Sequence, residues 1–120
     1  MSVTGTGTFT TTIQSGQPLS DEIDLGNEQL VAIQMPTGWD AANISFQASM
    51  ALAANGGIYQ DLYNDGGNEV IVVAAASRCI AINAAALSIA PLRYIRIRSG
   101  STGTPVNQTA ARILSLILKK

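Results

Sequence analysis

The sequence contains no histidine and only one cysteine, Cys79. Without histidine the chain cannot form a Ser-His-Asp or Cys-His catalytic site, and it has no imidazole to ligate a metal ion. A single cysteine rules out an intrachain disulfide, which excludes the class of small secreted domains held together by such bonds. Cys79 follows Arg78 on a predicted strand, and we interpret it as a small buried side chain rather than a reactive thiol.

Charge is also scarce in this chain. Charged residues make up 12% of the 120 residues, and the net charge is -1. Such a composition provides no basic face for nucleic acid. The longest apolar run, residues 70–76, is far shorter than the roughly 20 residues of a membrane-spanning helix. The first residues have neither the basic nor the apolar region of a signal peptide. We therefore expect synthesis in a reducing cytoplasm, with no nucleic-acid partner and no membrane partner.

The few charges are segregated along the chain. Residues 1–20 carry none, all eight acidic residues lie between Asp21 and Glu69, and all seven basic residues lie between Arg78 and Lys120. The favoured interpretation is that the acidic and basic halves pair within one subunit. The alternative is a molecule with two unlike faces, which would suit head-to-tail packing or docking on a charged scaffold.

Alternation of apolar and polar residues is the dominant pattern, and helical periodicity is almost absent. The alternation is clearest where Ile44, Phe46 and Ala48 are separated by single polar residues. Further strands are predicted at residues 23–25, 29–35, 58–63, 69–73, 78–82, 93–98 and 111–118, and one helical turn at residues 84–87. The pattern predicts an all-β fold, an antiparallel β-sandwich of jelly-roll or Greek-key type with eight or nine short strands.

The N-terminal segment is rich in threonine, with six threonines and two glycines among the first twelve residues. Threonine favours extended backbone because it is β-branched, but this segment has few apolar side chains to bury. We predict that residues 1–13 form an edge strand or an extended arm and that residues 14–120 form a single sandwich domain. An added strand binds a neighbour through backbone hydrogen bonds. The expected partner contacts here are Thr4, Thr6, Thr8 and Phe9.

Oxygen-bearing side chains cluster between residues 61 and 69, which raises the question of calcium. An EF-hand loop starting at Asp61 would place Tyr63 and Val72 where the motif requires oxygen ligands. A hairpin turn rich in Asn, Asp and Gly is the favoured interpretation, with a weak calcium site as the alternative. No two carboxylates are spaced for general acid–base catalysis, so we predict no catalytic residue, no bound metal and no cofactor.

One predicted strand carries Arg93, Arg96 and Arg98 beside Tyr94. Three cations and one aromatic ring fall short of the charged groove and stacking platform that bind single-stranded nucleic acid. We expect these arginines to pair with the acidic half of the chain or with a partner's carboxylates. Arg96 and Arg98 are therefore candidate partner contacts.

Trp39 is a further candidate contact, because it is the only tryptophan and lies in a predicted loop. Together with Tyr59 it could form a platform on which a sugar ring stacks. Packing in the core is the favoured use of Trp39, because a large apolar ring gains most from burial.

Three stretches of the sequence resemble a family of small structural proteins of tailed bacteriophages: LVAIQMPTGWDAANISFQAS, YQDLYNDGGNEV and RYIRIRSGSTGTPVNQTAARILSLIL. The resemblance covers residues 25–118. The sequence departs from the family pattern at residues 51–54, where Ala-Leu-Ala-Ala replaces the short Asp-Gly turn expected before the strand of Tyr59. No role is therefore carried over to this loop.

This resemblance implies a non-enzymatic virion protein, a cement or decoration protein that binds the major capsid protein on the capsid surface and stabilises the head. Such proteins are commonly jelly-roll-like and act as dimers or trimers, so it also implies a homo-oligomer. Two alternatives remain. The segments ISFQAS and GGIYQDLY resemble discoidin-type modules, which implies a carbohydrate-binding module of a head fibre or tail component. The other alternative is a tail or neck structural protein.

Overall fold

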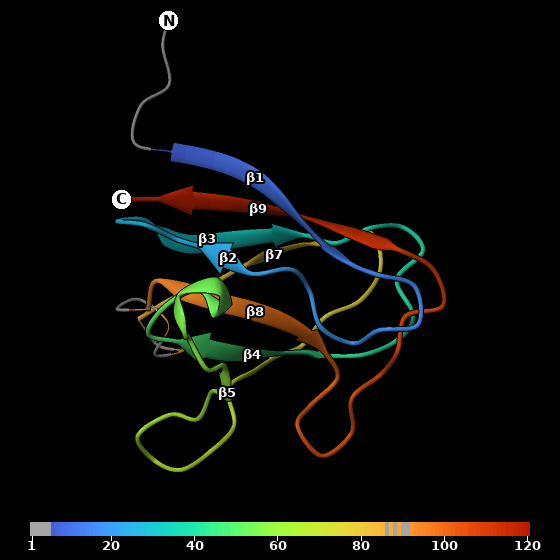
Figure 1. The fold of residues 1–120 in the computed structure, drawn as a ribbon. Coiled ribbons are helices and arrows are strands. Elements are labelled where there is room, and N and C mark those ends of the chain that lie inside the picture. Colours follow the sequence, from blue (N-terminus) through green and yellow to red (C-terminus); the bar gives the residue numbers. More distant parts are fainter. Residues whose placement is uncertain (1–5, 86, 88, 90–91) are drawn as a thin grey trace, which may run out of the picture.

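The computed structural model describes residues 6–85, 87, 89 and 92–120, and it consists of two antiparallel β-sheets that face each other (Figure 1). The four-stranded sheet has the order β1 (Thr6–Ile13), β9 (Arg112–Lys119), β3 (Gln29–Gln34) and β7 (Cys79–Ala81). The five-stranded sheet has the order β2 (Ile23–Asp24), β8 (Tyr94–Ser99), β4 (Ile44–Ser49) and β5 (Gln60–Asp61), and β6 (Ile71–Val72) also pairs with β4.

The order in which the chain visits the two sheets is that of a jelly roll. From β1 to β4, and again from β7 to β9, successive strands alternate between the sheets. Apart from β4 and its partners β5 and β6, strands that are neighbours within a sheet are therefore distant in sequence, as in the double Greek key. The sequence-based prediction of an antiparallel jelly-roll or Greek-key sandwich with eight or nine short strands is confirmed.

The core lies between the two sheets and is built by alternate residues of the long strands. In the five-stranded sheet Phe46 lies opposite Ile97, and both side chains are fully buried. In the four-stranded sheet Ile33 lies opposite Leu116, and both are again fully buried. Burying one such side chain contributes roughly 1.5–3 kcal/mol, so apolar packing between the sheets holds the fold together.

A β-bulge in β3 explains how an almost continuously apolar segment fits this pattern. The pairing of β3 with β9 shifts register between Leu30 and Ala32, which leaves Val31 as the extra residue. Because of this shift, Leu30 and Ile33 both face the core although they are three residues apart. The carbonyl oxygen of Val31 instead accepts a hydrogen bond of 2.8 Å from the backbone of Ile82.

The segment of the predicted helical turn makes one hydrogen-bonded turn, and the one helix among the described residues lies elsewhere. Near residues 84–87 the chain makes a hydrogen-bonded turn from Asn83 to Leu87, with residue 86 outside the described part. A 3-10 helix, η1 (Ala53–Asn55), instead lies in the segment predicted as a loop, and it ends at Gly56, whose φ of 85° suits glycine. No helix among the described residues is long and apolar enough to cross a membrane.

Candidate functional site

The threonine-rich segment is an edge strand for all of its described length. β1 pairs with β9 in unbroken register from Thr6 opposite Lys119 to Ile13 opposite Arg112. Residues 6–13 therefore belong to the four-stranded sheet and do not form a free arm. Thr4 lies outside the described residues, and Thr6 begins the strand. Of the predicted contacts in this segment, Thr8 is exposed and Phe9 is half-buried.

The outer face of the four-stranded sheet carries almost no charge. Its strand register places the following residues side by side on this surface, which we call the uncharged face: Thr8, Thr10, Thr12, Ala32, Gln34, Cys79, Ala81, Ile113, Ser115 and Ile117. The side chain of Ile113 is 57% exposed, and Lys119 is the charged residue at the rim. The face therefore offers a partner hydroxyl and apolar groups rather than charges.

Cys79 corrects a prediction made from the sequence. It is exposed rather than buried, because it lies opposite Gln34 on the uncharged face. The following residue, Ile80, is the one that packs against the core. β7 has only three residues, so alternation in the sequence did not establish whether Cys79 or Ile80 faces the core.

Thr8 and Phe9 also line an open cleft between β1 and the turn that follows β2. The cleft has a volume of about 420 Å³. Its wall combines apolar groups of Phe9, Leu25 and Leu118 with the side chains of Glu28 and Lys120. The structure thus brings Thr8 and Phe9, two of the predicted partner contacts, together at the border of the sandwich.

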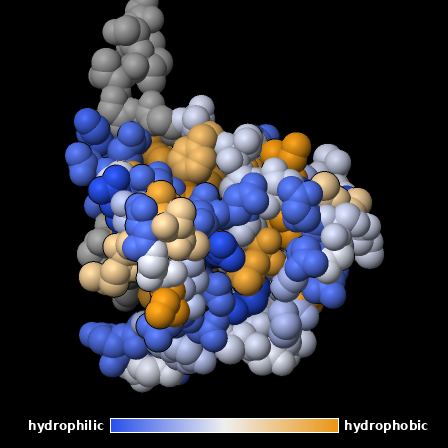
Figure 2. Space-filling model, in the orientation of Figure 1, coloured by the Kyte–Doolittle hydropathy of each residue, from blue (hydrophilic) through white to orange (hydrophobic). Residues whose placement is uncertain are grey.

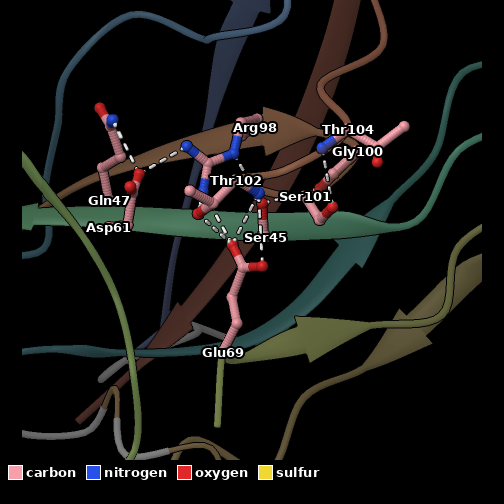
Figure 3. Close-up of polar contacts among 9 residues, drawn as sticks. All are labelled: Ser45, Gln47, Asp61, Glu69, Arg98, Gly100, Ser101, Thr102 and Thr104. Carbon is pink, nitrogen blue, oxygen red and sulfur yellow. Dashed lines mark hydrogen bonds and ion pairs between the residues drawn. The ribbon is translucent and has the colours of Figure 1, made fainter. Parts of the chain in front are cut away.

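The outer face of the five-stranded sheet is charged, and Arg98 is its centre (Figure 3). The Arg98 side chain is only 6% exposed. Its Nε donates to Ser45 Oγ at 2.9 Å, and its Nη1 donates to Asp61 Oδ1 at 2.6 Å. Its Nη2 donates to Glu69 Oε2 at 2.9 Å and to Thr102 Oγ1 at 2.8 Å. We call these five residues the Arg98 cluster.

The hairpin between β5 and β6 creates this cluster. Both strands pair with β4, and between them the chain leaves the sheet in a turn that begins at Asn64. Asn64 Oδ1 accepts hydrogen bonds from the backbone nitrogens of Gly66 and Asn68 at 2.9 and 3.0 Å, which closes the turn. Asp61 and Glu69, which flank the turn, therefore both reach Arg98.

This arrangement supports the hairpin interpretation of residues 61–69 over the calcium alternative. The carboxylates of Asp61 and Glu69 both pair with the Arg98 guanidinium group of the same chain. The hydrogen bond from Arg98 is the main cause that lowers the pKa of Asp61, and burial opposes it. In the described part of the chain, no three His, Cys, Asp or Glu side chains form a group that could hold a metal ion.

Arg96 lies two residues before Arg98 in β8, on the same face of the sheet, and its guanidinium group stacks on the Tyr59 ring. The Arg96 guanidinium carbon is 4.7 Å from the centre of the Tyr59 ring. The Tyr59 hydroxyl donates to Glu22 Oε2 at 2.7 Å, and the backbone nitrogen of Ala53 donates to the same oxygen at 3.0 Å. Glu22 thus fixes the segment that contains η1, and Arg96 is a half-buried part of this contact.

This geometry shifts the pKa values of Tyr59 and Glu22. Burial, followed by the hydrogen bond to Glu22, raises the pKa of Tyr59 above its ordinary value. The hydrogen bond from Tyr59, followed by that from the Ala53 backbone, lowers the pKa of Glu22. Both shifts favour the ionic form of Glu22 and the neutral form of Tyr59, which is the state that the contact requires.

The acidic and basic halves of the chain pair within one subunit. Four ion pairs occur among the described residues: Arg93–Asp24, Arg98–Asp61, Arg98–Glu69 and Arg112–Asp40. Each joins an acid from the first part of the sequence to an arginine from the second. The favoured interpretation of the charge segregation is confirmed, because strands distant in sequence are neighbours in this topology.

Trp39 and Arg98, two of the predicted partner contacts, are buried within the subunit. Trp39 is 6% exposed and belongs to the core, and its Nε1 donates to the carbonyl oxygen of Ala42 at 3.0 Å. Core packing, the favoured use of Trp39, is confirmed. Because Trp39 is buried, it does not form an accessible sugar-stacking platform with Tyr59. Arg98 is buried by its own cluster.

Gln108 is a polar residue that sequence reasoning missed. It is fully buried, and its Nε2 donates to Ser99 Oγ at 2.7 Å. Its Oε1 accepts from the backbone nitrogen of Asp40 at 2.8 Å and from Arg112 Nε at 3.2 Å. Gln108 therefore joins the loop before β9 to the loop that contains Asp40, a role with no signal in the local sequence.

The fold and these surfaces define a jelly-roll β-sandwich in which one sheet has a charged face with ion pairs inside the subunit and the other has an uncharged face. The chain matches no known family model, no curated protein and no solved structure.

Proposed function

We propose that this chain is a non-enzymatic structural protein of a bacteriophage virion, a cement or decoration protein that binds the major capsid protein and stabilises the head. The observation that carries the proposal is the uncharged face of the four-stranded sheet. The bacteriophage setting rests on the resemblance of three sequence stretches to small structural proteins of tailed phages. A tail or neck position is the competing outcome, because it would use the same fold.

The uncharged face has the composition of a surface that is covered in an assembly. The centres of protein interfaces are depleted of charged residues, and contiguous apolar exposure marks contact sites. Apolar residues reach the surface of this molecule in several places among polar ones (Figure 2). Ile113 is one of the large apolar side chains that are substantially exposed, and it lies beside Thr12 and Ser115 at one end of the uncharged face.

The ion pairs of the charged side chains also favour docking through the uncharged face. Arg98 on the charged face and Arg93, which precedes β8, are engaged with carboxylates of the same subunit. The charged face therefore has less unsatisfied charge with which to attract a partner. Docking through the uncharged face leaves these internal pairs intact, and no buried charge has to be desolvated.

A binding experiment with two matched lysine variants tests the proposal. Purified chain is added to capsids that lack it, and occupancy is measured after sedimentation. Ile113→Lys puts a charge on the uncharged face, whereas Val73→Lys puts one at a 71% exposed site after β6. We expect Ile113→Lys to reduce occupancy at least tenfold and Val73→Lys to bind as the unmodified chain does. Equal binding of both variants, or binding of the unmodified chain to tails alone, would contradict the proposal.

A further inference from the structure

β1 differs from every other strand at the described edges of the two sheets. It is eight residues long, whereas β7 has three residues and β2, β5 and β6 have two each. Natural edge strands avoid pairing with other chains by being short or by carrying charges, prolines or bulges. β1 has no charge and no proline, and its register with β9 is free of bulges. It therefore lacks each of these protections.

The backbone groups of Thr8 and Thr10 point away from the sheet along this edge. Ile13 bridges Ser20 on the side of β1 opposite β9, and the carbonyl oxygen of Thr12 accepts from the backbone nitrogen of Asp21 there at 3.1 Å. Backbone groups alternate sides along a strand, so those of Thr8 and Thr10 face the same side as those of Thr12. Among the described residues, nothing pairs with that edge before Thr12.

We propose that a second copy of this chain pairs with this edge, β1 against β1 in antiparallel orientation about a two-fold axis near Thr8 and Thr10. An antiparallel pair of identical strands is self-complementary, so each copy donates and accepts the same backbone hydrogen bonds. The uncharged edge creates no repulsion between copies, and threonines facing each other across a sheet are a favourable pair.

The ends of the strand also suit a second copy. Lys119 lies beside Thr6 at one end of β1, and Asp21 lies beside Thr12 at the other. Both are exposed, and neither forms an ion pair within the described residues. Antiparallel pairing of residues 7–11, where the edge is free, brings the Lys119 end of one copy up to Asp21 of the other, which ends the free edge at Thr12. The two four-stranded sheets then join into one sheet of eight strands with a continuous uncharged face.

A proline substitution tests this pairing directly. Thr10→Pro removes a backbone N–H that faces the free edge and leaves the hydrogen bonds to β9 intact, a position where edge strands tolerate proline. The matched control is Thr10→Ala, which keeps the N–H. Light scattering with size-exclusion chromatography should give about 25 kDa for the unmodified chain and Thr10→Ala, and 12.5 kDa, the mass of one chain, for Thr10→Pro.

Lysine variants provide a second test of the dimer, which remains informative if Thr10→Pro does not fold. The double variant Thr8→Lys/Thr10→Lys places like charges opposite each other in the dimer, so it should be monomeric at low salt and regain the dimer at high salt. Ser115→Lys adds a charge on the same face but one strand away from the edge, and it should remain dimeric. An unmodified chain that is monomeric throughout the micromolar range, or a folded Thr10→Pro variant or lysine pair that stays dimeric at low salt, would overturn the proposal. These results do not depend on the virion assignment, because they require no capsid.

Discussion

Arg98 and Glu69 are 29 residues apart in the sequence, and their side chains meet at 2.9 Å in an ion pair in which the arginine is 6% exposed. The same guanidinium binds Asp61 on the other side of the hairpin. A buried arginine is tolerated only when its donors are satisfied, so these carboxylates hold the hairpin against β8. The acidic and basic halves of the chain are joined at this point.

Removing Glu69 tests this relationship. Glu69→Ala leaves Arg98 Nη2 and the Thr102 backbone nitrogen without their carboxylate partner. We expect the free energy of unfolding to fall by about 1–3 kcal/mol, measured by urea denaturation. The control is Asp65→Ala in the same hairpin, an exposed site where a change within about 0.5 kcal/mol is expected. Equal effects of both variants would show that the Arg98 cluster does not stabilise the fold.

Gly100 offers a second test of the same region, because it follows β8 and leads to Thr102. Its φ is +92°, and a Cβ atom there would approach the Thr104 carbonyl oxygen. Gly100→Ala should therefore lower the free energy of unfolding by about 1–3 kcal/mol. Gly103→Ala is the matched control in the same loop, since an added Cβ meets nothing within 4 Å there and the φ is not in the left-handed region. Thermal denaturation of both variants checks the difference, and a stable Gly100→Ala would contradict it.

Acid should destabilise the protein over a defined pH range. The pKa values of Glu22, Asp24, Asp40 and Asp61 all lie below their ordinary values in the folded chain. The unfolded chain therefore binds protons first as the pH falls below 4.5 and 3.8, the ordinary values for Glu and Asp. The stability from these carboxylates is complete above that range and is lost as the pH falls through the lowered values. Denaturation midpoints that are unchanged from neutral pH to pH 3 would contradict this prediction.

At high pH, the ionisation of Tyr59 should lower the stability of the fold. Burial and the hydrogen bond to Glu22 raise its pKa, so the folded chain holds this proton more tightly than the unfolded chain does. The stability that results is complete below the ordinary value of 10.0 and is lost as the pH rises above it. Tyr59→Phe removes the titrating group, so this variant should lose less stability between pH 9 and pH 11 than the unmodified chain. Tyr63→Phe is the control at an exposed tyrosine. Parallel curves for the Tyr59 variant and the unmodified chain would contradict the assignment.

The sequence predicted most of the strands because alternation reports directly which residues face the core. Ile44, Phe46, Ile95 and Ile97 are buried as their alternation requires. The charge segregation also predicted the pairing between halves, since a jelly roll brings distant strands together. These features depend on local pattern and on strand order alone.

The sequence did not predict features in which the burial of a side chain depends on contacts with distant segments of the chain. Alternation correctly places Arg98 on the outer face of its sheet, but a hairpin from another strand buries it there. Cys79 lies in a strand too short for alternation to set its face. The polar groups of buried Gln108 are satisfied by hydrogen bonds with residues up to 68 positions away. Such tertiary contacts leave no periodic signal.

Imaging of the intact virion by electron cryomicroscopy is the measurement that tests the proposed function most directly. We predict jelly-roll density on the outer surface of the capsid, with the uncharged face that contains Ile113 turned toward the major capsid protein. Density in the tail or neck, or a capsid-bound molecule that turns the Arg98 cluster toward the shell, would contradict the proposal.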